Sequence, residues 1–95
     1  MTGRRLGRGA QYLRSLRTAG VSALSPQFQA ILAAERALAS AEILPGPLDY
    51  EVLIPPVRRA WVRRISGHNL WLYYSMREDV VYVLRVAREP PVPIA

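Results

Sequence analysis

The sequence has 95 residues, a length that accommodates one hydrophobic core, so we expect a single domain spanning residues 1–95. The 13 basic residues, all arginine, outnumber 7 acidic ones, and the net charge of +6 indicates an anionic partner such as nucleic acid or an acidic protein. Because cysteine is absent, disulfides, thiolate chemistry and cysteine-based zinc sites are excluded, and we expect no metal or cofactor. No apolar run approaches the roughly 18–20 residues of a membrane span, and no signal-peptide pattern follows the N-terminus, so we expect a soluble cytoplasmic protein.

The exclusive use of arginine has two interpretations. Arginine codons are GC-rich, and the many Ala, Gly and Pro residues fit a codon bias. Alternatively, planar guanidinium groups are selected because they bind carboxylates and phosphates through two parallel hydrogen bonds. We regard codon bias as the main cause, since the absence of lysine from a whole chain exceeds what one binding site requires.

The first predicted elements are a basic lead-in and a helix. Residues 1–8 contain two glycines and three arginines and are interpreted as a flexible lead-in or a very poor strand. Across residues 9–19, Leu13 and Leu16 belong to a helically spaced apolar set. Gly20 is suited to end this helix, because glycine readily adopts the left-handed conformation found there.

A longer helix is predicted over residues 26–42. Ser25 is a suitable N-cap, and Pro26 suits the first turn because its missing N–H would have no partner there anyway. Apolar side chains then recur at spacings of three and four. The predicted buried stripe contains Phe28, Ile31, Leu32, Glu35, Leu38 and Ala39.

The C-terminal half is predicted to form strands. After the break at residues 45–47, alternation over residues 48–54 indicates a strand that ends at two prolines. Residues 57–65 fit either a helix or a strand, and we favour a strand because a Ser-Gly-His-Asn turn and two clear β segments follow. These two segments cover residues 70–76 and 80–87, and the proline-rich residues 89–95 are expected to form an extended tail.

The segment 80–87 carries apolar residues on both of its predicted faces. Strict alternation places Arg85 on the same face as Val81 and Val83, so its charge should be partly buried and either paired internally or directed to a rim. A strand that is apolar on both faces further predicts that the free protein is stabilised by a partner or by self-association, including a possible homodimer.

The order of these elements predicts an α+β fold. Two N-terminal helices should pack on one face of a C-terminal antiparallel meander of three to four strands.

Residues 57–89 resemble the C-terminal meander of the RelE/ParE superfamily of bacterial toxins, and are closer to ParE. The resemblance rests on the order and spacing of an arginine-bearing strand, Gly67, a hydrophobic strand ending at Tyr73, the acidic pair Glu78-Asp79 and a strand with Arg85 near its end. The helices match the helical hairpin of the family. Three departures are the poor material for a first strand in MTGRRLG, Tyr74 where the family often has arginine, and the absence of the usual histidine-containing ending.

The resemblance implies the toxin component of a type II toxin–antitoxin module. ParE-like members inhibit growth by binding DNA gyrase, and a small antitoxin with an extended, often acidic segment neutralises them, so a toxin–antitoxin hetero-oligomer is expected. The predicted target- or antitoxin-binding residues are Arg58, Arg59, Trp61, Arg63, Tyr73, Arg85 and Arg88. They should act as a cationic surface rather than as acid–base catalysts. Core burial remains the alternative for Trp61 and Trp71, as does a solvated face for the arginines.

Two other functions remain open. RelE-like members cut mRNA on the ribosome, which requires cations at the phosphate and a group that handles the 2′-hydroxyl proton. Arginine is a poor base, and the only imidazole, His68, is expected in a solvated turn, so a non-enzymatic protein is favoured. A non-toxic basic nucleic-acid-binding module is the second alternative, since aromatic residues next to arginine also suit single-stranded RNA.

Overall fold

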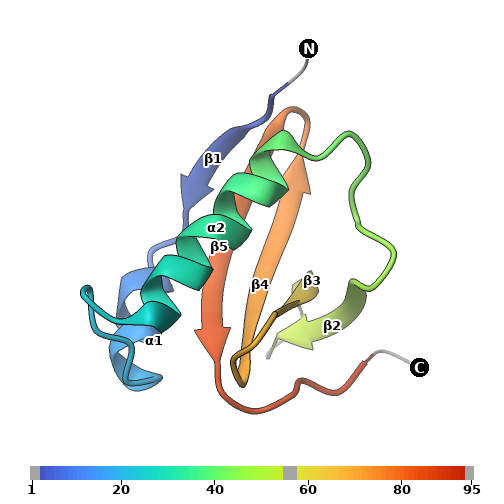
Figure 1. Cartoon of the computed structure of the whole chain (residues 1–95). Helices are drawn as coiled ribbons and strands as arrows, with labels where there is room; N and C mark the ends of the chain where they lie inside the picture. Colours follow the sequence, from blue (N-terminus) through green and yellow to red (C-terminus); the bar gives the residue numbers. More distant parts are fainter. Residues whose placement is uncertain (1–2, 55–57, 94–95) are drawn as a thin grey trace.

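Two helices lie against one face of a five-stranded mixed sheet in the computed structural model, which describes residues 3–54 and 58–93 (Figure 1). The α+β class is therefore confirmed. In chain order the elements are β1 (Arg5–Arg8), α1 (Tyr12–Thr18), α2 (Pro26–Ser40), β2 (Tyr50–Ile54), β3 (Arg58–Ile65), β4 (Leu70–Arg77) and β5 (Val80–Ala87).

The arrangement of the sheet differs from the predicted helices followed by an antiparallel meander. The strand order is β1-β5-β4-β3-β2, and β1 pairs with β5 in parallel while all other neighbours are antiparallel. The expectation of three to four strands was wrong because residues 5–8 form a strand rather than a flexible lead-in. Four residues with a central glycine are a poor strand in isolation, but they pair with the strongly β-forming β5.

The helices follow their predicted boundary signals, although α1 buries a different side. Gly20 has a φ of 74°, as expected for a residue that ends a helix, and the Ser25 side chain accepts a hydrogen bond from the Phe28 N–H at the start of α2. In α1, Tyr12 and Leu16 are buried, whereas Leu13 is 65% exposed. The prediction that Leu13 faces the core was therefore wrong, since the buried positions are spaced by four residues from Tyr12.

The sheet carries a separate apolar cluster on each face. The first cluster joins both helices to the sheet and includes Tyr12, Leu16, Ile31, Leu38, Ile65, Leu70, Leu72, Tyr74, Val81, Val83 and Val86. The second cluster comprises Val52, Ala60, Val62, Tyr73 and Leu84, with Tyr50, Ile54, Trp71 and Ala87 packed against it. The strands are therefore buried on both faces, although both helices pack against the first cluster.

A β-bulge in β5 explains why strict alternation fails there. Tyr74 pairs with Val83 but Tyr73 pairs with Arg85, so Leu84 is an extra residue on β5. Beyond the bulge the face of each side chain is inverted. Arg85 consequently lies opposite Val81 and Val83, and it is exposed rather than partly buried.

The segment before β2 and the C-terminal tail were predicted only in outline. β2 begins at Tyr50, two residues later than predicted, and Leu48 is 90% exposed in the loop that precedes it. The tail after β5 crosses to the side of β2 (Figure 1). There Pro93 forms an isolated antiparallel bridge with Val52, and the Tyr50 hydroxyl donates to the Pro91 carbonyl at 3.0 Å. The predicted stop at residues 55–56 lies outside the described residues.

Candidate binding groove

An open groove of about 710 Å³ lies between one side of α1 and the C-terminal end of β5. Its apolar part includes Leu84 of the second cluster and Ile54 and Ala87, which pack against that cluster. Four arginines line it, namely Arg14, Arg58, Arg85 and Arg88, and Glu89 is the only carboxylate among the described lining residues. This combination of an apolar floor and an excess of guanidinium groups suits an anionic ligand with apolar portions.

Arg85 reaches the groove because of the bulge at Leu84. The bulge places Arg85 directly across from Tyr73, and the guanidinium carbon lies 5.2 Å from the centre of the Tyr73 ring. This is a cation–π geometry, and it holds the side chain while leaving its N–H donors available. No ion pair of Arg85 with Glu51, Glu78 or Asp79 is present, so the internal pairing that we considered for it does not occur.

Arg88 has a structural contact as well as a place in the groove. Its Nε donates to the carbonyl of Ala19, just beyond α1, which satisfies a carbonyl at the C-terminal end of the helix. A positive charge at this end also interacts favourably with the negative pole of the helix dipole. Arg88 therefore joins the end of α1 to the end of β5.

Arg14 and Arg58 complete the cationic lining. Both are exposed, and neither forms an ion pair with any residue in the described part of the chain. Arg14 was missed in the sequence because it comes from α1, whereas the other arginines belong to the strand region. Its spacing of four residues from Ala10 and Thr18, which also line the groove, is the signal that identifies this side of the helix.

Four of the seven predicted binding residues do not line the groove, namely Arg59, Trp61, Arg63 and Tyr73. Arg59 is exposed and forms a 3.5 Å ion pair with Glu51 on β2. Trp61 is half-buried and packs against the first cluster, on the face that the helices cover. Tyr73 does not line the groove, but its ring lies under the guanidinium group of Arg85, which does.

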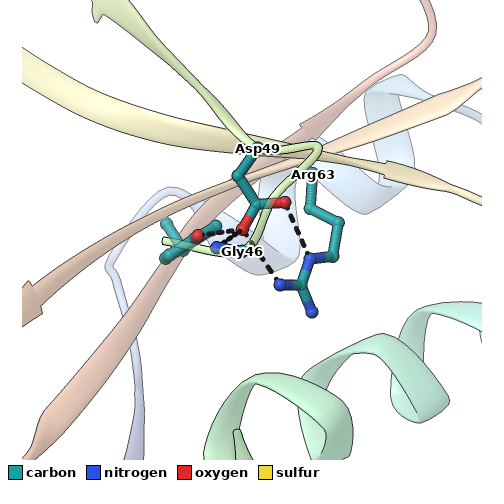
Figure 2. A network of polar contacts seen from close by, with 4 residues as sticks. Gly46, Asp49 and Arg63 are labelled. Carbon is teal, nitrogen blue, oxygen red and sulfur yellow. Dashed lines mark hydrogen bonds and ion pairs between the residues drawn. The ribbon is translucent and has the colours of Figure 1, made fainter. Parts of the chain in front are cut away.

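Arg63, the fourth of these residues, is bound within the protein (Figure 2). Its Nε and Nη2 atoms each donate to one oxygen of the Asp49 carboxylate at 2.9 Å. Asp49 also accepts from the Tyr74 hydroxyl and, at 2.8 Å, from the Gly46 N–H. Arg63 thus anchors the loop before β2 to the sheet.

The hydrogen bonds to Asp49 keep it ionised despite its burial. Burial raises the pKa of Asp49, but the hydrogen bonds from Arg63, Tyr74 and Gly46 outweigh this effect, and the net pKa lies below its usual value. The pKa of Tyr74 is raised well above its usual value by burial and by the adjacent carboxylate. The phenol therefore stays neutral and serves as a hydrogen-bond donor.

A second buried carboxylate joins the helices to β1. Glu35 on α2 is 3% exposed, and it accepts hydrogen bonds from the Tyr12 hydroxyl and, at 2.8 Å, from Arg8. Burial and the bond to Glu35 raise the pKa of Tyr12 strongly. We placed Glu35 in the buried stripe from its spacing, but its partners come from segments far away in the sequence and were not predicted.

Among its described lining residues, the groove offers four arginines and, apart from Glu89, no side chain of the types that usually act in acid–base catalysis. His68 lies in the predicted turn, where its backbone N–H donates to the Ile65 carbonyl, and it is not among the described residues that line the groove. Burial raises the pKa of Tyr73 despite the opposing charge of Arg85, which disfavours the phenolate. Within residues 3–54 and 58–93, no three metal-ligating side chains form a cluster, and no helix has the length and apolar character of a membrane span.

Comparisons with protein-family models, curated proteins and solved structures gave no match for this chain. The resemblance of residues 57–89 to the RelE/ParE superfamily therefore stays a prediction.

Proposed function

We propose that this chain is a ParE-like toxin of a type II toxin–antitoxin module. In this proposal it inhibits growth in the cytoplasm by binding an essential target, DNA gyrase by family resemblance, and a small acidic antitoxin neutralises it. The observation that carries the proposal is the convergence of Arg58, Arg85 and Arg88 on one groove with an apolar floor. Three arginines of the cationic surface expected from the resemblance thus meet in space.

The order of the elements supports the RelE/ParE-like architecture. The family has a strand ahead of its helical hairpin, and residues 1–7 had seemed too poor in apolar side chains to provide one. β1 now occupies that position, and the segment from Arg58 to Ala87 forms the three strands that the resemblance expects. One of the three departures is thereby removed.

Binding is favoured over mRNA cleavage by the composition of the groove. Cleavage requires a proton acceptor for the 2′-hydroxyl as well as cations for the phosphate. The described lining residues include no histidine, and Glu89 lies on the exposed tail segment rather than on a strand or helix. The groove is therefore better suited to hold an anionic group than to transfer a proton.

The proposal is tested by inducible expression in a bacterial host together with a supercoiling assay of purified DNA gyrase. We expect expression to arrest growth and the purified protein to inhibit supercoiling. Cleavage of ribosome-bound mRNA, with gyrase unaffected, would instead support the RelE-type alternative. If the protein binds RNA but does not arrest growth, the proposal is overturned in favour of the nucleic-acid-binding module, whose affinity should fall steeply between about 50 and 200 mM salt.

A further inference from the structure

The groove beside α1 has the size of a small-molecule site. Its volume of about 710 Å³ falls within the range of about 300–1,000 Å³ that is usual for such sites. Ile54, Leu84 and Ala87 give it an apolar floor, and four arginines also line it. In ligand sites an apolar surface holds most of the molecule, while a few charged groups orient it. The groove is therefore a candidate site for a small anion with an apolar portion.

The arginines of the groove have guanidinium donors that no carboxylate of the described residues occupies. Arg14 and Arg58 are exposed and take part in none of the ion pairs among the described residues. Arg85 is held against an aromatic ring, which leaves its N–H groups available. Arg88 uses its Nε for a carbonyl at the end of α1, and its two Nη groups remain. Planar guanidinium groups bind a carboxylate through parallel hydrogen bonds, so they favour an anionic head group over a neutral one.

The uncharged part of the lining favours an aliphatic ligand over a nucleotide. The Ser15 hydroxyl donates to one backbone carbonyl and accepts from the Val86 N–H, and the Thr18 hydroxyl donates to another carbonyl. Among the neutral polar side chains of the described lining, Gln11 alone then remains to recognise the edge of a base. No aromatic side chain is among the described lining residues, so a base would find no ring on which to stack.

We propose that this groove binds a medium-chain aliphatic carboxylate. The alkyl chain lies on Ile54, Leu84 and Ala87, and the carboxylate accepts hydrogen bonds from the guanidinium groups of the lining. Arg85 is the principal donor, because its contact with Tyr73 holds it in place before the ligand arrives. The inference does not depend on the proposed function, although the ligand occupies the same groove.

Titration calorimetry and amide NMR of the intact protein test the proposal. The probes are hexanoate, octanoate and decanoate, each kept below the concentration at which it forms micelles. We expect decanoate to bind at one site and to shift the amide signals of Ile54, Leu84 and Ala87. Each extension by two carbons should tighten binding about fivefold to fifteenfold, because the added methylene groups leave water. Decanol, which has the chain without the charge, should bind at least about tenfold more weakly than decanoate.

Two pairs of variants locate the ligand. Arg85→Met should weaken decanoate binding about fivefold to tenfold, whereas Arg64→Met, which removes an arginine that does not line the groove, should change it less than twofold. Ala10→Glu adds a negative charge to the groove and should weaken binding to a similar extent. Its matched control is Ala37→Glu, at an exposed alanine of α2 outside the groove, which should change the affinity less than twofold. Ala10 and Arg85 are both exposed, so either variant alone decides the question if the other fails to fold.

Several results would overturn the proposal. They are an affinity that is independent of chain length, decanol binding as tightly as decanoate, and an affinity that Arg85→Met and Ala10→Glu leave unchanged. Adenosine monophosphate binding more tightly than decanoate at the same amides would also overturn it, in favour of a nucleotide. Because the titration contains neither gyrase nor cells, its failure leaves the proposed function standing, and a protein that does not arrest growth leaves this inference standing.

Discussion

The loop–sheet network around Asp49 and the groove beside α1 both contain arginines, but in opposite electrostatic settings. Arg63 donates two hydrogen bonds to a carboxylate that is 2% exposed. Arg58 and Arg85 line the groove, and neither has an ion-pair partner in the described part of the chain. The difference teaches that sequence proximity does not define a cationic site here, because Arg58 and Arg63 lie on one strand and have different roles.

Asp49→Asn should give the largest loss of stability, because it leaves the Arg63 guanidinium and the Tyr74 hydroxyl without their shared ionised acceptor. Breaking a buried pair in this way costs about 3–5 kcal/mol, and the partial exposure of Arg63 favours the lower value. Urea denaturation measures the change. The matched control is Glu51→Gln, which removes an exposed pair and should change stability by at most about 1 kcal/mol. Equal effects of the two substitutions would show that the Asp49 network does not anchor the fold.

Gly46→Ala should produce a smaller loss through the same network. A Cβ at this position would lie 2.5 Å from Arg63 Nη2 and 3.2 Å from a carboxylate oxygen of Asp49, so the ion pair must shift. We expect a destabilisation of about 1–3 kcal/mol in urea or thermal unfolding. Gly3→Ala is the control, since its Cβ would meet no atom within 4 Å. A Gly46→Ala protein as stable as the parent would mean that the network tolerates a displaced arginine.

The buried tyrosines predict a loss of stability in alkaline solution. The folded protein holds the pKa of Tyr12 and Tyr74 far above the value of about 10 in the unfolded chain. Their contribution is complete below about pH 10 and is lost as the pH rises further, because only the unfolded chain then releases their protons. Each tyrosine should contribute a slope of about 1.4 kcal/mol per pH unit.

Urea titrations from about pH 8 to pH 11.5 would measure this slope, and arginine does not contribute to it because it stays protonated. Tyr12→Phe and Tyr74→Phe should each reduce the slope by about 1.4 kcal/mol per pH unit, which is the contribution of one proton. A flat profile in the parent protein would contradict the burial of both phenols.

Much of the fold was predictable because it depends on local periodicity. The alternation in residues 80–87, the turn that follows residues 58–65 and the cap formed by Ser25 are properties of neighbouring residues, and they predicted three elements correctly. The strand status of residues 5–8 depends instead on pairing with β5, at the other end of the chain. Local sequence gives little information about such a pairing.

The candidate site was predictable only in part for the same reason. Arg58, Arg85 and Arg88 were selected by charge and order, but the bulge that turns Arg85 toward the groove is a matter of register between β4 and β5. The partner of Arg63 comes from a loop that precedes β2, and no spacing rule connects it with β3. Long-range pairing therefore decides which arginines are bound internally and which line the groove.

The most direct test of the groove as the functional site compares Arg85→Met with Arg64→Met. Both arginines lie over an aromatic ring, Arg85 at 5.2 Å from Tyr73 and Arg64 at 5.7 Å from Trp71, but only Arg85 lines the groove. We predict that the free energy of unfolding of each variant lies within about 1 kcal/mol of the parent's value. Arg85→Met should relieve the growth arrest caused by expression and weaken target binding by about 2–5 kcal/mol, while Arg64→Met should arrest growth like the parent. A folded Arg85→Met protein that arrests growth as strongly as the parent would contradict the account.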